Sequence, residues 1–293
     1  MAESVSERRA WLRDRIGRRD ALLVPGAGNA LTARVIEDAG FEACYVTGAG
    51  IANTHLGAPD IGLVTLSEVA ATVAAIAEIS TLPLIVDIDT GFGNALNAQR
   101  TVRVLERAGA AALQIEDQVF PKKCGHFAGK AVIPAPEMCG KIRAAVDARD
   151  DDNLLIIART DARAIDGLEA ALDRAERFIE AGADLTFVEA PVSVDEMRAI
   201  TGRLSVPQVA NMVVGGKTPL LPRDALAEIG FALVLYANAP LQAAMRAMSN
   251  VLAALKRDGS LDSVIGDLAD FEERQRLVDK GSYDALEARY RVD

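Results

Sequence analysis

Short apolar runs alternate with longer amphipathic segments over most of the chain. The apolar runs are four or five residues long and are typical of buried strands. They lie at residues 21–24, 43–47, 84–88, 111–115, 154–158, 184–188, 207–210 and 232–235. Helical patterns lie between them, at residues 30–39, 66–77, 94–109, 135–147, 168–181, 194–204 and 223–230. Because buried parallel strands are connected by helices, this alternation predicts eight strand–helix units, the number in a (β/α)8 barrel.

Both ends of the chain extend beyond this repeat. Residues 4–19 predict a helix, with Ser4 or Ser6 as its N-cap, that plugs or flanks the bottom of the barrel. Residues 241–256 and 261–291 predict further helices, and the second of these segments is strongly charged. Such a tail buries little apolar surface alone, so it either folds back on its own barrel or packs on another subunit. We therefore expect a single barrel domain with a helical tail.

Composition agrees with this fold and excludes several kinds of partner. Half of the 293 residues are apolar but only 4% are aromatic, so the core must consist mainly of Ala, Val, Leu and Ile. A net charge of −10 argues against nucleic acid or an anionic membrane as partner. Three cysteines without metal-site spacing indicate a reducing compartment. With no apolar signal core and no apolar run long enough to span a bilayer, we expect a cytoplasmic protein.

Carboxylates follow two consecutive predicted strands. Asp87 and Asp89 end the strand at 84–88, and Glu116 ends the next one at 111–115. The carboxyl ends of parallel strands converge on one crevice, where barrels place their active sites. Clustered carboxylates without nearby His or Cys ligands suit Mg²⁺ or Mn²⁺. The alternative is that the aspartates only cap the following helix or turn.

Polar residues also end three later strands. Arg159, Glu189 and Asn211 each follow an apolar run. Singly, each would more often be a salt-bridge or capping residue, but a strand facing the core has no packing reason to end in such side chains. Together they indicate a catalytic rim, and Arg159 is a suitable bidentate partner for a substrate carboxylate.

The segment KKCGH combines basic residues with a thiol. Cys124 lies between Lys122 and Lys123 on one side and His126 on the other, in a stretch broken by glycine and proline. Such a stretch is expected to be a loop that closes over a ligand. Its neighbours favour the thiolate, which makes Cys124 a candidate acid, base or nucleophile. The alternative is a solvated basic loop with an incidental cysteine.

Two other segments have weaker signals. The small residues Thr47, Gly48 and Ala49 follow a strand and would let a ligand carboxylate approach the backbone amides, although these residues alone favour a plain tight turn. Asp60 lies in an irregular loop, residues 55–62, where an aspartate alone indicates only turn chemistry. Cys44 and Cys139 lie in apolar or helical surroundings and are expected to be inert.

These motifs resemble one known family. VDIDTGFGN (86–94), IEDQV (115–119) and KKCGH (122–126) are similar to the isocitrate lyase and phosphoenolpyruvate mutase superfamily, and most to its short lyase branch. The resemblance extends from Pro25 to about Asn250. KKCGH is the specific part, because the superfamily's phosphonomutases and oxaloacetate decarboxylases generally lack this cysteine. The resemblance implies a (β/α)8 barrel, Mg²⁺ and a homotetramer in which the terminal barrel helix is swapped between subunits.

The resemblance also implies roles for individual residues. Asp87 would hold the metal, with Asp89 and Glu116 acting through water. The implied catalytic residues are Cys124, Lys122, His126, Asp60 and Glu189, with Cys124 as general acid. The implied substrate-binding residues are Tyr45, Thr47, Gly48, Ala49, Gly125, Arg159 and Asn211.

The expected activity is cleavage of a carbon–carbon bond in a 2-hydroxy di- or tricarboxylate, releasing pyruvate or another α-oxo acid. After Tyr236 the chain reads ANAPLQAAM, whereas 2-methylisocitrate lyases have a proline directly after the matching tyrosine. The sequence therefore predicts a smaller alkylmalate, such as 2,3-dimethylmalate, as the substrate no less than 2-methylisocitrate. The alternatives are an oxaloacetate hydrolase, a carboxyphosphonoenolpyruvate phosphonomutase, or a barrel that binds a dicarboxylate without turnover.

Overall fold

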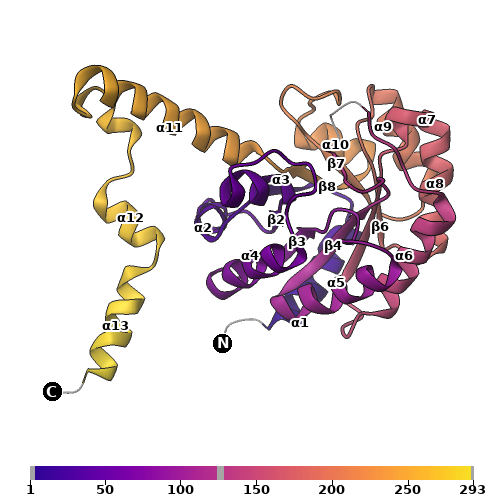
Figure 1. Ribbon diagram of the computed structural model, residues 1–293, viewed down its shortest axis with the longest axis horizontal. Coiled ribbons are helices and arrows are strands. Elements are labelled where there is room, and N and C mark those ends of the chain that lie inside the picture. The colour runs from indigo at the N-terminus through magenta and orange to yellow at the C-terminus, as the bar shows by residue number, and fades with distance from the viewer. Residues whose placement is uncertain (1–3, 124–128, 292–293) are drawn as a thin grey trace.

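A closed barrel of parallel strands forms the centre of the protein. The computed structural model describes residues 4–123 and 129–291 (Figure 1). The strands are β1 (Leu22–Ala27), β2 (Cys44–Val46), β3 (Leu84–Asp87), β4 (Ala110–Glu116), β5 (Leu155–Thr160), β6 (Leu185–Val188), β7 (Gln208–Asn211) and β8 (Phe231–Tyr236). They pair in chain order, and β1 closes the barrel against β8. The predicted (β/α)8 fold is confirmed, and every predicted strand overlaps an observed one.

Helices surround the barrel and connect its strands. They are α2 (Ala30–Asp38), α3 (Gly48–Ile51), α4 (Leu66–Ile79), α5 (Ala95–Ala108), α6 (Ala135–Asp147), α7 (Arg163–Asp166), α8 (Leu168–Glu180), α9 (Val194–Arg203) and α10 (Arg223–Ile229). Local chemistry sets several boundaries: Asn94 caps α5, and Gly109 ends it at a φ of 108°. The turn expected at residues 47–50 and the start of the irregular loop expected at residues 55–62 are instead helical: they fall in α3 and in the π-helical turn η1 (Ala52–Leu56).

The N-terminal helix closes the bottom of the barrel, as expected. Helix α1 (Val5–Gly17) begins at a capping box between Ser4 and Glu7. Its Leu12 and Ile16 are buried in a cluster with residues of the strands. Arg9 is also buried, and its guanidinium donates to the carbonyl oxygen of Ala110 at 2.9 Å. The helix therefore seals the end of the barrel opposite the carboxyl ends of the strands.

The layer between strands and helices is built almost entirely from aliphatic side chains. Val73, Ile76, Leu105 and Ile142 are fully buried there, together with a few aromatic rings such as that of Phe178. Aliphatic side chains fill the narrow space between a barrel and its helices, which explains the low aromatic content.

The C-terminal tail leaves the barrel. It consists of α11 (Ala239–Asp258), η2 (Asp262–Asp267), α12 (Phe271–Leu277) and α13 (Lys280–Tyr290), which project to one side of the barrel (Figure 1). Arg276 on α12 pairs with Asp38 at the end of α2, 2.6 Å apart. Ala254 is its only buried residue among those that the structure describes. Large apolar side chains are exposed on it, Phe271 to 69%. Within residues 4–123 and 129–291, no helix has the length and apolar character needed to cross a membrane.

Candidate active site

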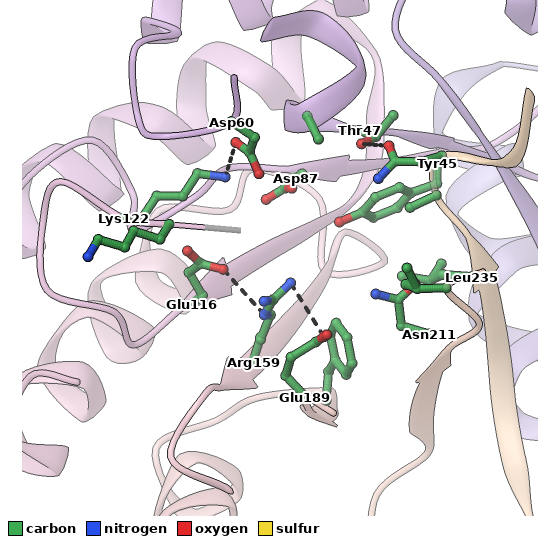
Figure 2. Close-up of a pocket in the computed structure, with 16 residues that line it drawn as sticks. Tyr45, Thr47, Asp60, Asp87, Glu116, Lys122, Arg159, Glu189, Asn211 and Leu235 are labelled. Carbon is green, nitrogen blue, oxygen red and sulfur yellow. Dashed lines mark hydrogen bonds and ion pairs between the residues drawn. The ribbon is translucent and has the colours of Figure 1, made fainter. Parts of the chain in front are cut away.

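One pocket opens at the carboxyl ends of the strands, where a barrel carries its chemistry. Most of the polar residues singled out from the sequence face it, although they come from six different strands or the loops after them (Figure 2). Its predicted lining residues are Tyr45, Thr47, Ala49, Asp60, Asp87, Glu116, Lys122, Arg159, Glu189 and Asn211. The barrel topology therefore brings together side chains that lie up to 166 positions apart in the chain, from Tyr45 to Asn211.

Lys122 lies within the carboxylate cluster. Its Nζ atom is 2.5 Å from Oδ1 of Asp60 and 2.7 Å from Oδ1 of Asp89, and its side chain is almost fully buried. Burial lowers the pKa of Lys122, but the surrounding carboxylates outweigh this effect and raise it well above its usual value. Burial has the opposite effect on the acid Asp89: it raises the pKa of this carboxyl to about 7, although the charge of Lys122 acts to lower it. The cluster thus holds a positive charge among its carboxylates.

The predicted metal-binding carboxylates fit a hard divalent cation. Asp87 and Glu116 line the pocket, and Glu116 is buried. The Oε1 atom of Glu116 accepts no hydrogen bond from any described residue, and burial raises the pKa of this carboxyl well above its usual range. A cation would satisfy this oxygen. No three His, Cys, Asp or Glu side chains in the described ranges lie close enough to share a metal directly, so water would have to complete the coordination.

A glycine allows the backbone to lie against these carboxylates. A Cβ atom added at Gly48 would be 3.2 Å from Oδ2 of Asp87 and 3.3 Å from Oδ1 of Asp89. Gly48 is buried behind Thr47 and Ala49, which line the pocket. The Thr47 hydroxyl accepts from the amide of Gly50 at 3.3 Å and so caps this helical turn. The segment predicted to bind a carboxylate therefore adjoins the predicted metal ligands.

Tyr45 lines the pocket and is buried. Its hydroxyl oxygen accepts a hydrogen bond of 2.8 Å from Nε2 of Gln114. Burial raises the pKa of Tyr45 well above its usual value, so the phenol stays neutral and keeps its proton for donation.

Arg159 is held rigidly at the centre of the pocket. Its Nε and one terminal nitrogen donate to the carboxylate of Asp161, at 2.9 and 3.2 Å. Its Nε also lies 3.3 Å from Glu116, and the other terminal nitrogen lies 3.6 Å from Glu189 (Figure 2). The guanidinium carbon is 5.1 Å from the centre of the Phe187 ring. These contacts pre-orient the guanidinium for a substrate anion.

Several lining residues were not predicted from the sequence. They are Lys123, Phe187, Val213, Leu235, Ala237 and Asn238. Phe187, Val213 and Leu235 belong to apolar stretches that are indistinguishable from core in the sequence. Asn238 and Ala237 lie in the segment after Tyr236 that had been singled out for its difference from the 2-methylisocitrate lyases. Asn238 accepts from the Thr47 hydroxyl at 3.4 Å, which connects the ends of β2 and β8.

Three predicted site residues, Cys124, Gly125 and His126, lie outside the described residues. The chain on the N-terminal side of this gap reaches the pocket, since Lys123 lines it. Gln118 holds Lys123 by two hydrogen bonds, one to its amide and one to its carbonyl group. The other two cysteines, Cys44 and Cys139, are buried as expected.

Comparison with known sequences gives extensive matches. A family model described as phosphoenolpyruvate phosphomutase matches residues 12–256. The chain is 44% identical to the 2,3-dimethylmalate lyase of Eubacterium barkeri over 269 residues, which cover 92% of this chain and 93% of that protein. It is 45% identical to a 2-methylisocitrate lyase of Aeropyrum pernix over 277 residues, which cover 94% of this chain and 89% of that protein.

Solved structures are similar over nearly the whole chain. A crystal structure of 2,3-dimethylmalate lyase has a TM-score of 0.91 at 35% identity and covers 96% of this chain and 95% of its own. Oxaloacetate acetylhydrolase bound to 3,3-difluorooxalacetate has a TM-score of 0.89 at 30% identity, with 97% and 96% covered. A phosphonopyruvate hydrolase in complex with oxalate and Mg²⁺ has a TM-score of 0.87 at 32% identity, with 97% and 99% covered.

Proposed function

The chain belongs to the phosphoenolpyruvate mutase/isocitrate lyase superfamily, and we propose that it is a Mg²⁺-dependent carbon–carbon lyase acting on a 2-hydroxy di- or tricarboxylate. The substrate would be of the 2,3-dimethylmalate or 2-methylisocitrate type, and one product pyruvate or another α-oxo acid. The observation that carries this proposal is the position of Arg159: its guanidinium lies in the pocket 3.3 Å from Glu116, so a cation for a substrate carboxylate adjoins the metal donor set. Relatives named as lyases support the same class.

The donor set favours Mg²⁺, with Mn²⁺ as the alternative. Asp87, Asp89 and Glu116 would hold the ion, which would act as a Lewis acid that lowers the pKa of the substrate hydroxyl. The superfamily includes a structure with oxalate and Mg²⁺. Lys122 would balance the negative charge of this cluster as ligands bind and leave, and Asp60 would hold Lys122 in place, because Lys122 contacts both Asp60 and Asp89.

Two groups of residues would bind the two halves of the substrate. Thr47, Gly48 and Ala49, beside the predicted metal ligands, would bind the carboxylate of the α-oxo acid half through backbone amides. Arg159 and Asn211 would bind the half that leaves, and Glu189 would hold Arg159 in place. These proposed binding residues all lie in the described part of the chain, and all but Gly48 line the same pocket, which supports catalysis by orientation of the substrate.

Cleavage requires a proton donor. A basic group in the pocket would accept the hydroxyl proton, the C–O bond becomes a carbonyl, and the C–C bond breaks with its electron pair on the carbon next to a carboxylate. That carbanion is very unstable, so it must be protonated as it forms. Cys124 would donate the thiol proton to this carbon, with His126 and Gly125 completing the same loop. This role rests on the KKCGH motif.

The test is a pyruvate assay coupled to lactate dehydrogenase. Purified enzyme with excess Mg²⁺ is given 2,3-dimethylmalate or 2-methylisocitrate, and pyruvate is expected from at least one. The Cys124→Ser variant is expected to lose about 10²- to 10⁴-fold in kcat, the usual contribution of a general acid. Cys139→Ser, at a buried cysteine away from the pocket, is the matched control and should keep its activity. Near-normal turnover by Cys124→Ser would remove this residue from the mechanism.

A second activity is supported by a specific observation. Oxaloacetate acetylhydrolase is similar over 97% of this chain, so hydrolysis of oxaloacetate is the principal alternative. Oxalate release from oxaloacetate, with no pyruvate from either malate derivative, would establish it. A phosphonomutase reaction is the other enzymatic alternative, whereas a barrel that only binds dicarboxylates would release no product from any of these compounds.

We also propose that the protein is a homotetramer with an exchanged helix. Helix α11 has exposed Met245, Met248 and Leu252, and an apolar groove lies beside β1 and β8, lined by Leu23, Phe41 and other residues. An apolar helix face from a second copy would cover such a groove. Light scattering coupled to gel filtration would test the tetramer, and a monomer would contradict it. The cytoplasmic location stays a prediction.

A further inference from the structure

A buried lysine that does not line the pocket lies behind the predicted metal ligands. Lys141, on α6, is 4% exposed, and its Nζ atom donates to the carbonyl oxygen of Thr90 at 3.1 Å. None of the ion pairs in the described ranges includes it. Burial lowers the pKa of Lys141, with only a weaker opposing effect from Glu137. Burying an ammonium without a close carboxylate is costly, so its position calls for a physical explanation.

The carbonyl group that Lys141 binds belongs to the turn that carries Asp89. This turn has unfavourable backbone angles at two residues other than glycine: φ is 47° at Asp89 and 57° at Phe92. Gly91 and Gly93 also have positive φ. Left-handed backbone at residues other than glycine costs roughly 1–2 kcal/mol each and persists only where surrounding contacts hold it.

Three successive carbonyl groups of this turn are each held by a different element. The amide of Glu116, on β4, donates to the oxygen of Asp89 at 2.8 Å. Lys141, on α6, donates to the oxygen of Thr90 at 3.1 Å. The hydroxyl of Thr101, on α5, donates to the oxygen of Gly91 at 3.3 Å. Helices α5 and α6 lie side by side outside β4, so both reach the same turn (Figure 1).

We propose that Lys141 is a positioning residue that fixes the turn after β3 and thereby sets the affinity of the Asp87–Asp89–Glu116 cluster for a divalent cation. Without Lys141 the buried carbonyl group of Thr90 has no donor among the residues that the structure describes, and the turn relaxes towards ordinary backbone angles. Asp89 then moves relative to Glu116, whose amide is bonded to the same turn. The inference rests on the metal site of the proposed function and adds a residue outside the pocket to it.

Mn²⁺ binding tests this role without depending on turnover. The full-length protein is titrated with Mn²⁺, and free Mn²⁺ is followed by its electron paramagnetic resonance signal. Lys141→Met keeps the length of the side chain and removes its donor. Its Kd for Mn²⁺ is expected to rise about 10- to 100-fold, the range found when groups that orient metal ligands are removed. Lys141→Arg keeps a donor and is expected to bind Mn²⁺ more tightly than Lys141→Met.

The matched control is Lys280→Met, which removes a lysine from an exposed ion pair with Asp284 in α13 and should leave the Kd unchanged. An unchanged Kd in Lys141→Met, with or without a lower Tm, would overturn the inference and leave the metal site intact. Failure of the unmodified protein to bind Mn²⁺ would instead overturn the metal site itself. If Lys141→Met does not fold, Lys141→Gln replaces it, because the shorter glutamine side chain does not reach Thr90. An unchanged Kd for Mn²⁺ in Lys141→Gln would overturn the inference in the same way.

Discussion

The ammonium of Lys122 and the carboxylate of Asp89 form a buried ion pair, with 2.7 Å between Nζ and Oδ1. The two residues come from different loops, after β4 and β3. Their pairing connects the base of the KKCGH segment to the predicted metal ligands. It also gives the carboxylate cluster a cation of its own within the protein.

Removing this cation should make stability depend on metal. Lys122→Met leaves Asp60 and Asp89 without their buried partner, a change that typically costs about 3–5 kcal/mol. Excess Mg²⁺ supplies positive charge to the same carboxylates, so it is expected to raise the Tm of Lys122→Met more than that of the unmodified protein. Thermal unfolding of the two proteins, each in EDTA and in Mg²⁺, measures the two Tm shifts. Equal Mg²⁺-induced shifts would show that Lys122 and the metal do not share these carboxylates.

Adding one methyl group at Gly48 should disturb the cluster. The new Cβ would lie 3.2 Å from Asp87 and 3.3 Å from Asp89, closer than ordinary contact, so the carboxylates must shift. Gly48→Ala is expected to weaken Mn²⁺ binding about tenfold, which corresponds to roughly 1.4 kcal/mol. Gly202→Ala is the control, since nothing lies within 4 Å of a Cβ there. Tight Mn²⁺ binding by Gly48→Ala would show that the carboxylates have room to adjust.

The ion pairs of Asp161 should make stability sensitive to acid. Burial raises the pKa of Asp161, but Arg159 and Lys130 outweigh it and lower the pKa from 3.8 to about 2. Because the folded-state pKa is the lower one, this stabilisation is present above about pH 4 and is lost as the pH falls towards 2. The shift corresponds to about 2 kcal/mol.

Urea unfolding of the unmodified protein and of Asp161→Asn at several pH values measures this contribution. The unmodified protein is expected to be the more stable near neutral pH. The difference between the two free energies of unfolding should then narrow by about 2 kcal/mol between about pH 4 and pH 2. Parallel pH profiles would show that Asp161 keeps its ordinary pKa in the folded state.

The three cysteines should differ sharply in reactivity. Cys44 is fully buried, and burial raises the pKa of its thiol to about 12. Cys139 is also buried. Only Cys124 is expected to react quickly with iodoacetamide in the native protein near neutral pH, and all three should react after unfolding. Peptide mass spectrometry identifies the labelled site. Rapid labelling of Cys44 or Cys139 in the native state would contradict the observed packing.

The order and the type of the elements were predictable because they depend on local properties. The strands are short apolar runs, and α5 begins at the cap of Asn94 and ends at Gly109, where a left-handed residue is needed. The polar strand ends were also readable, since Asp87, Arg159, Glu189 and Asn211 interrupt apolar runs. They line one pocket because the carboxyl ends of all strands in a barrel meet at the same rim.

The sequence could not show which of two neighbouring acidic residues lines the pocket. Glu116 and Asp117 both follow the fourth strand, but only Glu116 lines the pocket. The carboxylate of Asp117 is fully buried and accepts from Thr160 at 2.7 Å and from Arg174 at 2.9 Å. The partners of Asp117 come from β5 and α8, more than 40 positions away in the chain.

By itself, the sequence determined the barrel, its strand ends and the chemical character of its rim, because hydrophobic periodicity and caps act over a few residues. Only the tertiary structure decided that Lys122 pairs with Asp60 and Asp89, and that Lys141 supports the turn of Asp89 from a neighbouring helix. These contacts join residues between 33 and 62 positions apart. Which side chain meets which carboxylate depends on how the helices and loops pack around the closed barrel, and no local pattern encodes that.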